Sequence, residues 1–130
     1  MRPKIVVLGG TGFVGRHLAA RLAHFPDLDA VFVVHRQRPD WQIGAGLSFF
    51  DCPLTDTARL NSLLAEASHV INLLRPDGSG ERLATLSAIA ESLASSSLKR
   101  YIHASSIDVY GEADGMVLSE ATAPLPGTVG

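Results

Sequence analysis

The sequence has little cysteine, little tyrosine and no clustered charge of one sign. Cys52 is the only cysteine, so the chain forms no internal disulfide, and this thiol alone supports no metal site. A cysteine-poor chain fits the reducing cytoplasm, which is the location that we expect. The formal net charge is -2 and no run of lysine and arginine is present, which argues against a nucleic acid partner.

Long hydrophobic runs are also missing. Because about 20 consecutive apolar residues are needed to cross a bilayer, we expect no membrane partner. The basic start Met1–Lys4 precedes an apolar run that is too short for a signal peptide and ends in glycines. The five histidines have no metal-ligand spacing, so no metal is expected. With 130 residues, 46% of them hydrophobic, the chain is long enough for one domain with a buried core.

A glycine-rich segment stands near the start of the chain. The apolar run Ile5–Leu8 leads into Gly9-Gly10-Thr11-Gly12-Phe13-Val14-Gly15, and apolar residues then recur at helical spacing. Strand, glycine turn and helix, in this order, are typical of a dinucleotide-binding unit. Glycines let the backbone approach a pyrophosphate closely, and the helix N-terminus attracts its negative charge. We therefore expect a dinucleotide here; the alternative is an ordinary tight turn.

Apolar runs and amphipathic segments alternate along the rest of the chain. Strands are predicted at 4–8, 30–35, 47–51, 69–74 and 100–104. Helices are predicted at 13–24, after Thr55 or Asp56 with an apolar face of Leu60, Leu63, Leu64 and Ala67, and after Gly80 with a face of Leu83, Leu86, Ala90 and Leu93. This alternation predicts an α/β fold, a doubly wound parallel sheet of the Rossmann type with strand order 3-2-1-4-5. We expect residues 1–111 to form this domain and residues 112–130 an irregular tail.

Polar residues follow the predicted strands, where ligands of such sheets bind. Arg36 and Arg38 follow the second strand, at the position where an acid would bind the adenosine ribose of NAD. A guanidinium group suits the 2′-phosphate of NADP instead. We expect NADP as the cofactor, with NAD possible; an ordinary solvated basic loop is the alternative.

Three segments together resemble the extended short-chain dehydrogenase/reductase family, which includes the sugar-nucleotide epimerases and dehydratases. They are the glycine loop, Asp51 after the third strand, and Ser105-Ser106-Ile107-Asp108-Val109-Tyr110-Gly111 after the fifth. The resemblance implies an NAD(P)-dependent enzyme that acts on a nucleotide sugar by hydride chemistry. It implies that Ser106 is catalytic and hydrogen-bonds a substrate oxygen, and that Asp51 lies near the adenine ring. The cofactor-binding residues that we expect are Gly9, Gly10, Thr11, Gly12, Phe13, Val14, Gly15, Arg36, Asp51, Cys52, Leu73, Leu74 and Ser105.

The sequence departs from that family in its tyrosines. The family's catalytic Y-x-x-x-K should follow Ser106 near the end of this sequence, yet the only tyrosines are Tyr101 and Tyr110, and neither has a lysine four residues later. We therefore expect the chain to be the amino-terminal part of an enzyme, truncated before the sixth strand and the substrate domain, and inactive alone. The helices through which the family usually dimerises would lie beyond Gly130, so a homodimer remains possible.

Two alternatives stay open. A non-catalytic dinucleotide-binding or sensor protein is favoured by the missing tyrosine and by Leu74-Arg75, where the family has small residues. A stable truncated product that binds little would leave the edge of the fifth strand exposed to pairing with another chain. Asp108 lies where dehydratases of the family carry a glutamate, and we favour a loop-structuring role for it.

Overall fold

The sheet consists of parallel strands in the predicted order. The computed structural model describes residues 2–75, 79–94, 96–106, 110 and 115–124. Five strands pair in the order β3-β2-β1-β4-β5, all parallel. Their bounds are β1 (Lys4–Leu8), β2 (Asp29–Val34), β3 (Leu47–Asp51), β4 (His69–Asn72) and β5 (Arg100–His103). The predicted fold class and strand order are confirmed, and the carboxyl ends of all five strands meet at one edge.

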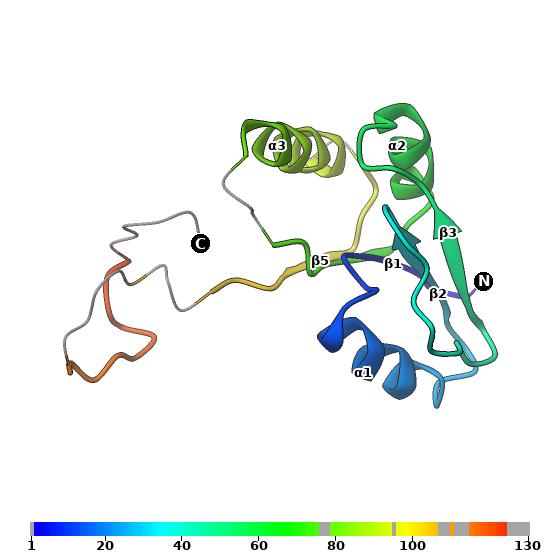
Figure 1. Ribbon diagram of the computed structural model, residues 1–130, viewed down its shortest axis with the longest axis horizontal. Helices are drawn as coiled ribbons and strands as arrows, with labels where there is room; N and C mark the ends of the chain where they lie inside the picture. The colour runs from blue at the N-terminus through cyan, green and yellow to red at the C-terminus, as the bar shows by residue number, and fades with distance from the viewer. Residues whose placement is uncertain (1, 76–78, 95, 107–109, 111–114, 125–130) are drawn as a thin grey trace.

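Helices cover both faces of the sheet (Figure 1). α1 (Phe13–Leu22) lies on one face, and α2 (Thr57–Ala65) and α3 (Gly80–Ala94) lie on the other. α2 begins at Asp56, whose carboxylate accepts a hydrogen bond of 3.2 Å from the backbone N–H of Arg59. This N-cap satisfies one of the donors that a helix start leaves unpaired.

Two clusters of apolar side chains fill the space between the layers. Phe32 and Ala19 lie in the cluster under α1, where Trp41 packs edge-to-face on Phe32 with ring centroids 6.3 Å apart. The larger cluster lies under α2 and α3 and joins both helices to the sheet. It includes the predicted face of α2, all of which is buried: Leu60, Leu63, Leu64 and Ala67.

Two sequence-based details were wrong. Of the predicted α3 face, Leu86 and Leu93 do pack against the larger cluster, but Leu83 is 43% exposed and Ala90 is exposed. The buried residues of α3 are Thr85 and Ile89, which were not predicted. The apolar repeat of α3 is broad, so the packing against α2 and the sheet selects the face. The predicted fourth strand continued to residue 74, but β4 ends at Asn72. The Asn72 side-chain oxygen accepts the Leu74 N–H at 2.9 Å, a local bond that competes with the strand ladder.

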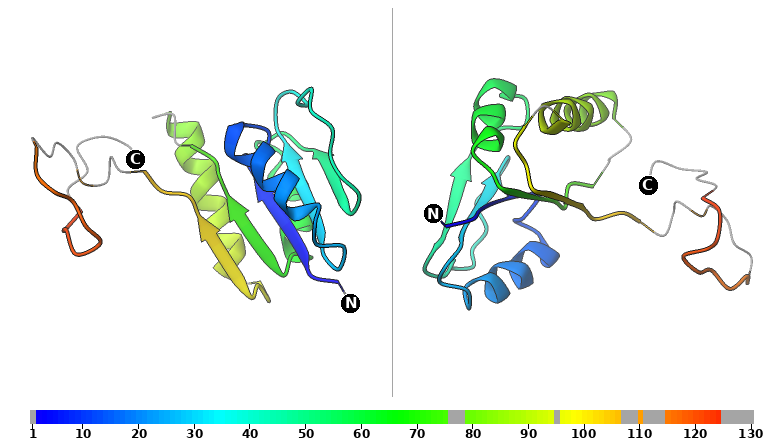
Figure 2. Two further views of the ribbon diagram at one scale, coloured as in Figure 1. Left: turned by 90° about the horizontal axis from the view of Figure 1, so that it is seen from below. Right: turned by 180° about the vertical axis from the view of Figure 1, so that it is seen from behind.

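β5 forms an edge of the sheet, and all four of its residues are exposed. Beyond it the chain leads away from the sheet, as Figures 1 and 2 show. The described residues of this tail, 115–124, contain no helix or strand.

Candidate functional site

The glycine loop between β1 and α1 is held by close backbone contacts. Gly9 has a φ of +70°, and a Cβ there would lie 2.8 Å from the backbone of Leu73 and of Leu74. A Cβ on Gly15 would lie 1.9 Å from the carbonyl oxygen of Gly10. A side chain at either position would clash with backbone atoms, so these glycines set how closely the loop, α1 and the end of β4 pack.

The N-terminus of α1 is open at Gly12. This residue is the N-cap with a φ of -88°, and a Cβ built on it meets nothing within 4 Å. It offers no side-chain cap, and the first turn of α1, which is described in full, has no acidic residue. Phe13 and Val14 are 78% and 59% exposed. A helix start with uncapped N–H groups and no acidic residue in its first turn is suited to bind an anion.

Asp51 forms an ion pair with Arg38. The guanidinium contacts both carboxylate oxygens, with Nε–oxygen distances of 3.0 and 3.1 Å and an Nη2–Oδ2 distance of 2.5 Å. Arg38 also lies over the ring of Phe49. Hydrogen bonding from Arg38 lowers the pKa of the Asp51 carboxyl. The carboxylate predicted to lie near the adenine ring is therefore occupied by Arg38 in this structure.

A shallow cleft joins the glycine loop to the loop after β2. It has a volume of about 440 Å³ and is lined by Thr11 and by residues 37–41, including Arg38 and Trp41. Trp41 also packs edge-to-face on Phe49, with ring centroids 5.3 Å apart. Because Trp41 is the only tryptophan of the chain, its fluorescence reports directly on this cleft.

The side chains of three predicted cofactor-binding residues belong to the core. Cys52 is fully buried, and its thiol lies 3.5 Å from the Pro53 carbonyl oxygen. Burial raises the pKa of the Cys52 thiol, which disfavours its nucleophilic form. Leu74 is 3% exposed in the cluster under α2 and α3, and Leu73 packs on the cluster under α1. The backbone of Leu73 and Leu74 lies next to Gly9 of the glycine loop.

Sequence reasoning missed Asn72, which is 1% exposed at the end of β4. Besides its bond to Leu74, its amide nitrogen donates to the Tyr101 hydroxyl at 2.9 Å. Asn72 therefore links β4, β5 and the loop that touches Gly9. The signal in the sequence was an amide residue inside the apolar run 70–74, since a buried amide needs hydrogen-bond partners.

The two serines after β5 lie at the carboxyl edge of the sheet. Ser105 is exposed and Ser106 is half-buried. Asp108, Val109 and Gly111, which belong to the same predicted motif, lie outside the described residues.

Neither a metal cluster nor a membrane helix is found in the described part of the chain. No group of three or more histidine, cysteine, aspartate or glutamate side chains could hold a metal ion there. No helix in those residues is long and apolar enough to cross a membrane.

The sequence pattern of the NAD dependent epimerase/dehydratase family matches residues 5–128. The chain belongs to this family. A comparison with curated proteins finds no match.

Solved structures resemble this epimerase/dehydratase-family chain over nearly all of its length. MoeE5 in complex with UDP-glucose and NAD is 30% identical, with a TM-score of 0.74 over 95% of this chain. UDP-glucuronic acid 4-epimerase from Bacillus cereus in complex with NAD is 26% identical, with a TM-score of 0.77 over 96%. A UDP-glucose 4-epimerase at 22% identity and a TM-score of 0.77 supports the fold alone. The chain spans 42%, 47% and 42% of these three proteins, respectively.

Proposed function

We propose that this chain is the dinucleotide-binding part of an NAD(P)-dependent epimerase/dehydratase that acts on a nucleotide sugar. The observation that carries the proposal is the open N-terminus of α1 at Gly12, facing the carboxyl edge of the sheet. A pyrophosphate there would accept hydrogen bonds from backbone N–H groups and benefit from the helix dipole. Family membership, and likeness to proteins solved with NAD and UDP-sugars, support it.

NADP is the cofactor that we propose, with NAD as the alternative. The residues after β2 are His35 and Arg36 rather than an acid, and a guanidinium group suits the additional 2′-phosphate. The complexes of similar proteins contain NAD, which supports a nicotinamide dinucleotide without favouring NADP.

In catalysis, the bound nicotinamide would supply hydride transfer. We propose that Ser106 hydrogen-bonds the substrate oxygen at the end of β5. The base has no counterpart in these 130 residues, because neither tyrosine has a lysine four residues later, and the hydroxyl of Tyr101 already accepts a bond from Asn72. By itself the chain should therefore bind cofactor without turnover.

The open N-terminus of α1 is also compatible with a second candidate, a non-catalytic dinucleotide-binding or sensor protein, which the missing tyrosine–lysine pair favours. Its discriminating feature is Ser106, which a sensor does not need. The longest open reading frame that contains this sequence should be expressed and assayed with UDP-glucose and UDP-glucuronic acid. Turnover that is lost in Ser106→Ala favours the enzyme; saturable cofactor binding with no turnover of any nucleotide sugar favours the sensor.

Energy transfer from Trp41 to the dihydronicotinamide tests cofactor binding by the chain. We expect wild type to show saturable energy transfer with NADPH. In Gly12→Asp the affinity for NADPH should be at least about tenfold weaker, because the new carboxylate fills the open site and repels the pyrophosphate. Ala20→Asp adds the same charge at an exposed position further along α1 and should leave affinity unchanged. Gly15→Ala should instead impair folding, because its Cβ meets the Gly10 carbonyl. Equal affinity of Gly12→Asp and wild type would refute the proposed pyrophosphate site.

A further inference from the structure

The titratable side chains on the solvent-exposed face of α1 are all basic. Arg16, His17, Arg21 and His24 are exposed in α1 and shortly after it, and the sequence of α1 contains no aspartate or glutamate. Residues at such spacings lie on one side of a helix, so these four side chains form one surface, the α1 face. Because the whole chain has a formal net charge of -2, this face departs locally from the overall balance. The α1 face therefore attracts anionic groups.

The arginines of the α1 face differ from other basic residues in their surroundings. Three basic side chains elsewhere form salt bridges with carboxylates: Arg2, Lys4 and Arg38. Arg36 and Arg82 line a cavity of about 180 Å³ that Glu81 lines as well. Neither Arg16 nor Arg21 forms a salt bridge in the described part of the chain. Their charge is therefore available to an acidic group of another molecule.

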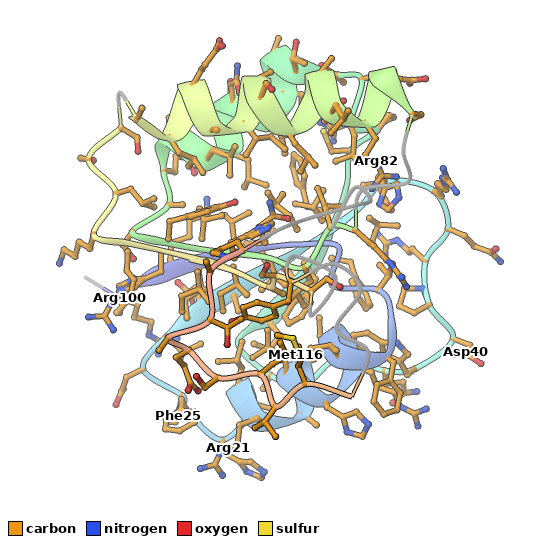
Figure 3. The ribbon with its side chains drawn as sticks, turned by 90° about the vertical axis from the view of Figure 1, so that its left-hand side faces the viewer. Arg21, Phe25, Asp40, Arg82, Arg100 and Met116 are labelled. Carbon is orange, nitrogen blue, oxygen red and sulfur yellow. The ribbon has the colours of Figure 1, made fainter. Side chains whose placement is uncertain are left out.

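Aromatic rings hold two of these basic side chains in place. The ring of His17 lies edge-on to the ring of Phe13, with centroids 4.7 Å apart. The guanidinium of Arg21 lies over the ring of Phe25, 5.5 Å from its centroid. Figure 3 shows Arg21 and Phe25 together on the side of α1 that faces away from the sheet. Because these contacts restrict the side chains before binding, less conformational entropy is lost when a partner docks.

A groove lies beside the α1 face, between α1 and the loop that connects β2 to β3. Its volume is about 270 Å³, and it is lined by Arg16 and three alanines of α1 and by Trp41, Gln42 and Gly44 of the loop. A Cβ on Gly44 would lie 2.7 Å from the Ala23 Cβ, so the loop comes this close to α1 only because both residues are small. The volume is below the roughly 300–1,000 Å³ of pockets that hold a whole small molecule, and it suits a single side chain.

We propose that the α1 face and this groove bind an acidic peptide segment of a partner protein. An apolar side chain of the segment fills the groove against Trp41, and carboxylates of the segment pair with Arg16 and Arg21. Charge complementarity selects an acidic partner, and the mixed lining of the groove selects a partner that also offers an apolar side chain. The surface is separate from the proposed dinucleotide site, because Arg21 lies at the end of α1 away from the glycine loop.

Two other anionic partners fit the observations less well. A bilayer surface is flat on this scale and would leave the groove between α1 and the loop empty. Nucleic acid carries a dense row of phosphates, which proteins bind with many clustered lysines and arginines, whereas the arginines of the α1 face are Arg16 and Arg21 alone. An acidic segment with an apolar residue uses both the charge and the groove.

Selection from a library of random peptides displayed on yeast tests this surface. We expect the peptides that bind wild type to be enriched in aspartate and glutamate around one large apolar residue. A selected peptide is then labelled with fluorescein and titrated by fluorescence anisotropy. Its affinity should fall about three- to tenfold in Arg16→Gln and in Arg21→Gln, because each variant loses a charge-assisted hydrogen bond. Ala20→Phe fills the groove without a change of charge and should also weaken binding.

Arg59→Gln is the matched control. Arg59 of α2 also lies over a phenylalanine ring, 4.6 Å from the centroid of Phe50, but on the opposite face of the sheet from α1, so this variant should bind the peptide like wild type. Thermal melting confirms that each variant is folded. The proposal is overturned if acidic peptides are not enriched, if NADPH displaces the peptide, or if Arg16→Gln and Arg21→Gln bind it no more weakly than Arg59→Gln.

Anionic partners of other classes are measured in parallel. Phosphatidylserine vesicles and a uridine oligonucleotide are titrated with wild type and with Arg21→Gln. We expect neither to show saturable binding that depends on Arg21. Such binding, without selection of acidic peptides, would assign the α1 face to a lipid surface or to RNA and would overturn the proposal.

Discussion

Single glycines of one loop carry different physical requirements. Gly15 and Gly9 have no room for a side chain, because a Cβ would meet backbone atoms at 1.9 and 2.8 Å. Gly12 has room on every side within 4 Å, in a backbone conformation open to other residues. The first two glycines are therefore needed for the packing of the loop, whereas Gly12 leaves the start of α1 open. A motif that reads uniformly in sequence thus divides into positions that need glycine for packing and one that does not.

His35 should make stability depend on pH. Its pKa is lowered from 6.5 in the folded state, so the unfolded chain binds more protons as the pH falls below about 6.5. The free energy of unfolding should therefore decrease from about pH 7.5 to pH 5.5, and the stability contributed by the neutral imidazole is lost as the pH falls through its folded pKa.

Urea unfolding across this pH range measures the effect in wild type and His35→Gln. The variant cannot titrate at this position, so its stability should vary less with pH. His24→Gln, at an exposed position after α1, provides the matched control and should follow wild type. An unchanged pH slope in His35→Gln would show that the lowered pKa has no consequence for folding.

At the scale of the elements, the side chain of Asn72 connects three parts of the fold. It joins β4 to β5 through the Tyr101 hydroxyl and positions the loop that contacts Gly9 through the Leu74 N–H. Parallel strand pairs are joined mainly by backbone hydrogen bonds, so a buried side-chain bridge fixes the strand ends where the ladder stops. Asn72 therefore fixes the ends of β4 and β5 relative to each other and to the loop after β4.

Replacing Asn72 should destabilise the chain markedly. Asn72→Ala removes both bonds and leaves a cavity, for an expected loss of about 2–4 kcal/mol of unfolding free energy. Tyr101→Phe leaves the buried amide without one acceptor, for about 1–2 kcal/mol. Chemical denaturation of both variants and of the double variant measures the coupling, and Asn61→Ala, at an exposed site of α2, serves as control. Strictly additive losses would mean that the Asn72–Tyr101 bond contributes nothing.

The fold was largely predictable, and the charge pairing was not. Continuous apolar runs identify buried parallel strands, and the right-handed crossover rule limits their order. The pairing of Arg38 with Asp51 depends instead on the β2–β3 register, which places Val34 beside Asp51. The cavity shared by Arg36 and Arg82 depends on α3 crossing the face opposite α1. Neither relation is local in sequence, so no residue pattern could reveal it.

At the scale of the whole molecule, the exposed sheet edge at β5 is the main feature that favours association with another chain. Among the residues that the structure describes, β5 pairs with β4 alone, and Tyr101 and Ile102 are 43% and 49% exposed. Ile71 of β4 packs against the cluster under α1, but its β5 neighbour Ile102 does not belong to that cluster. Edge strands with exposed apolar residues favour pairing with another chain.

We expect the chain to self-associate through β5 at high concentration. Ile102→Lys places a charge on the edge and should weaken association about tenfold, as sedimentation velocity over a concentration series would measure. Val117→Lys makes a similar change in the tail, where the valine is 94% exposed, and should have little effect. Equal weakening by both substitutions would place the contact outside the strand edge.

Short-range chemistry in the sequence determined the strands, the buried face of α2 and the glycine turn before α1. These features depend on side-chain periodicity and on backbone freedom, which neighbouring residues set by themselves. The tertiary structure alone decided which face of α3 is buried, which arginine Asp51 neutralises and which two arginines share a cavity. Those outcomes depend on how separate elements pack, because charges that are distant in sequence interact only once the sheet and its helices bring them together.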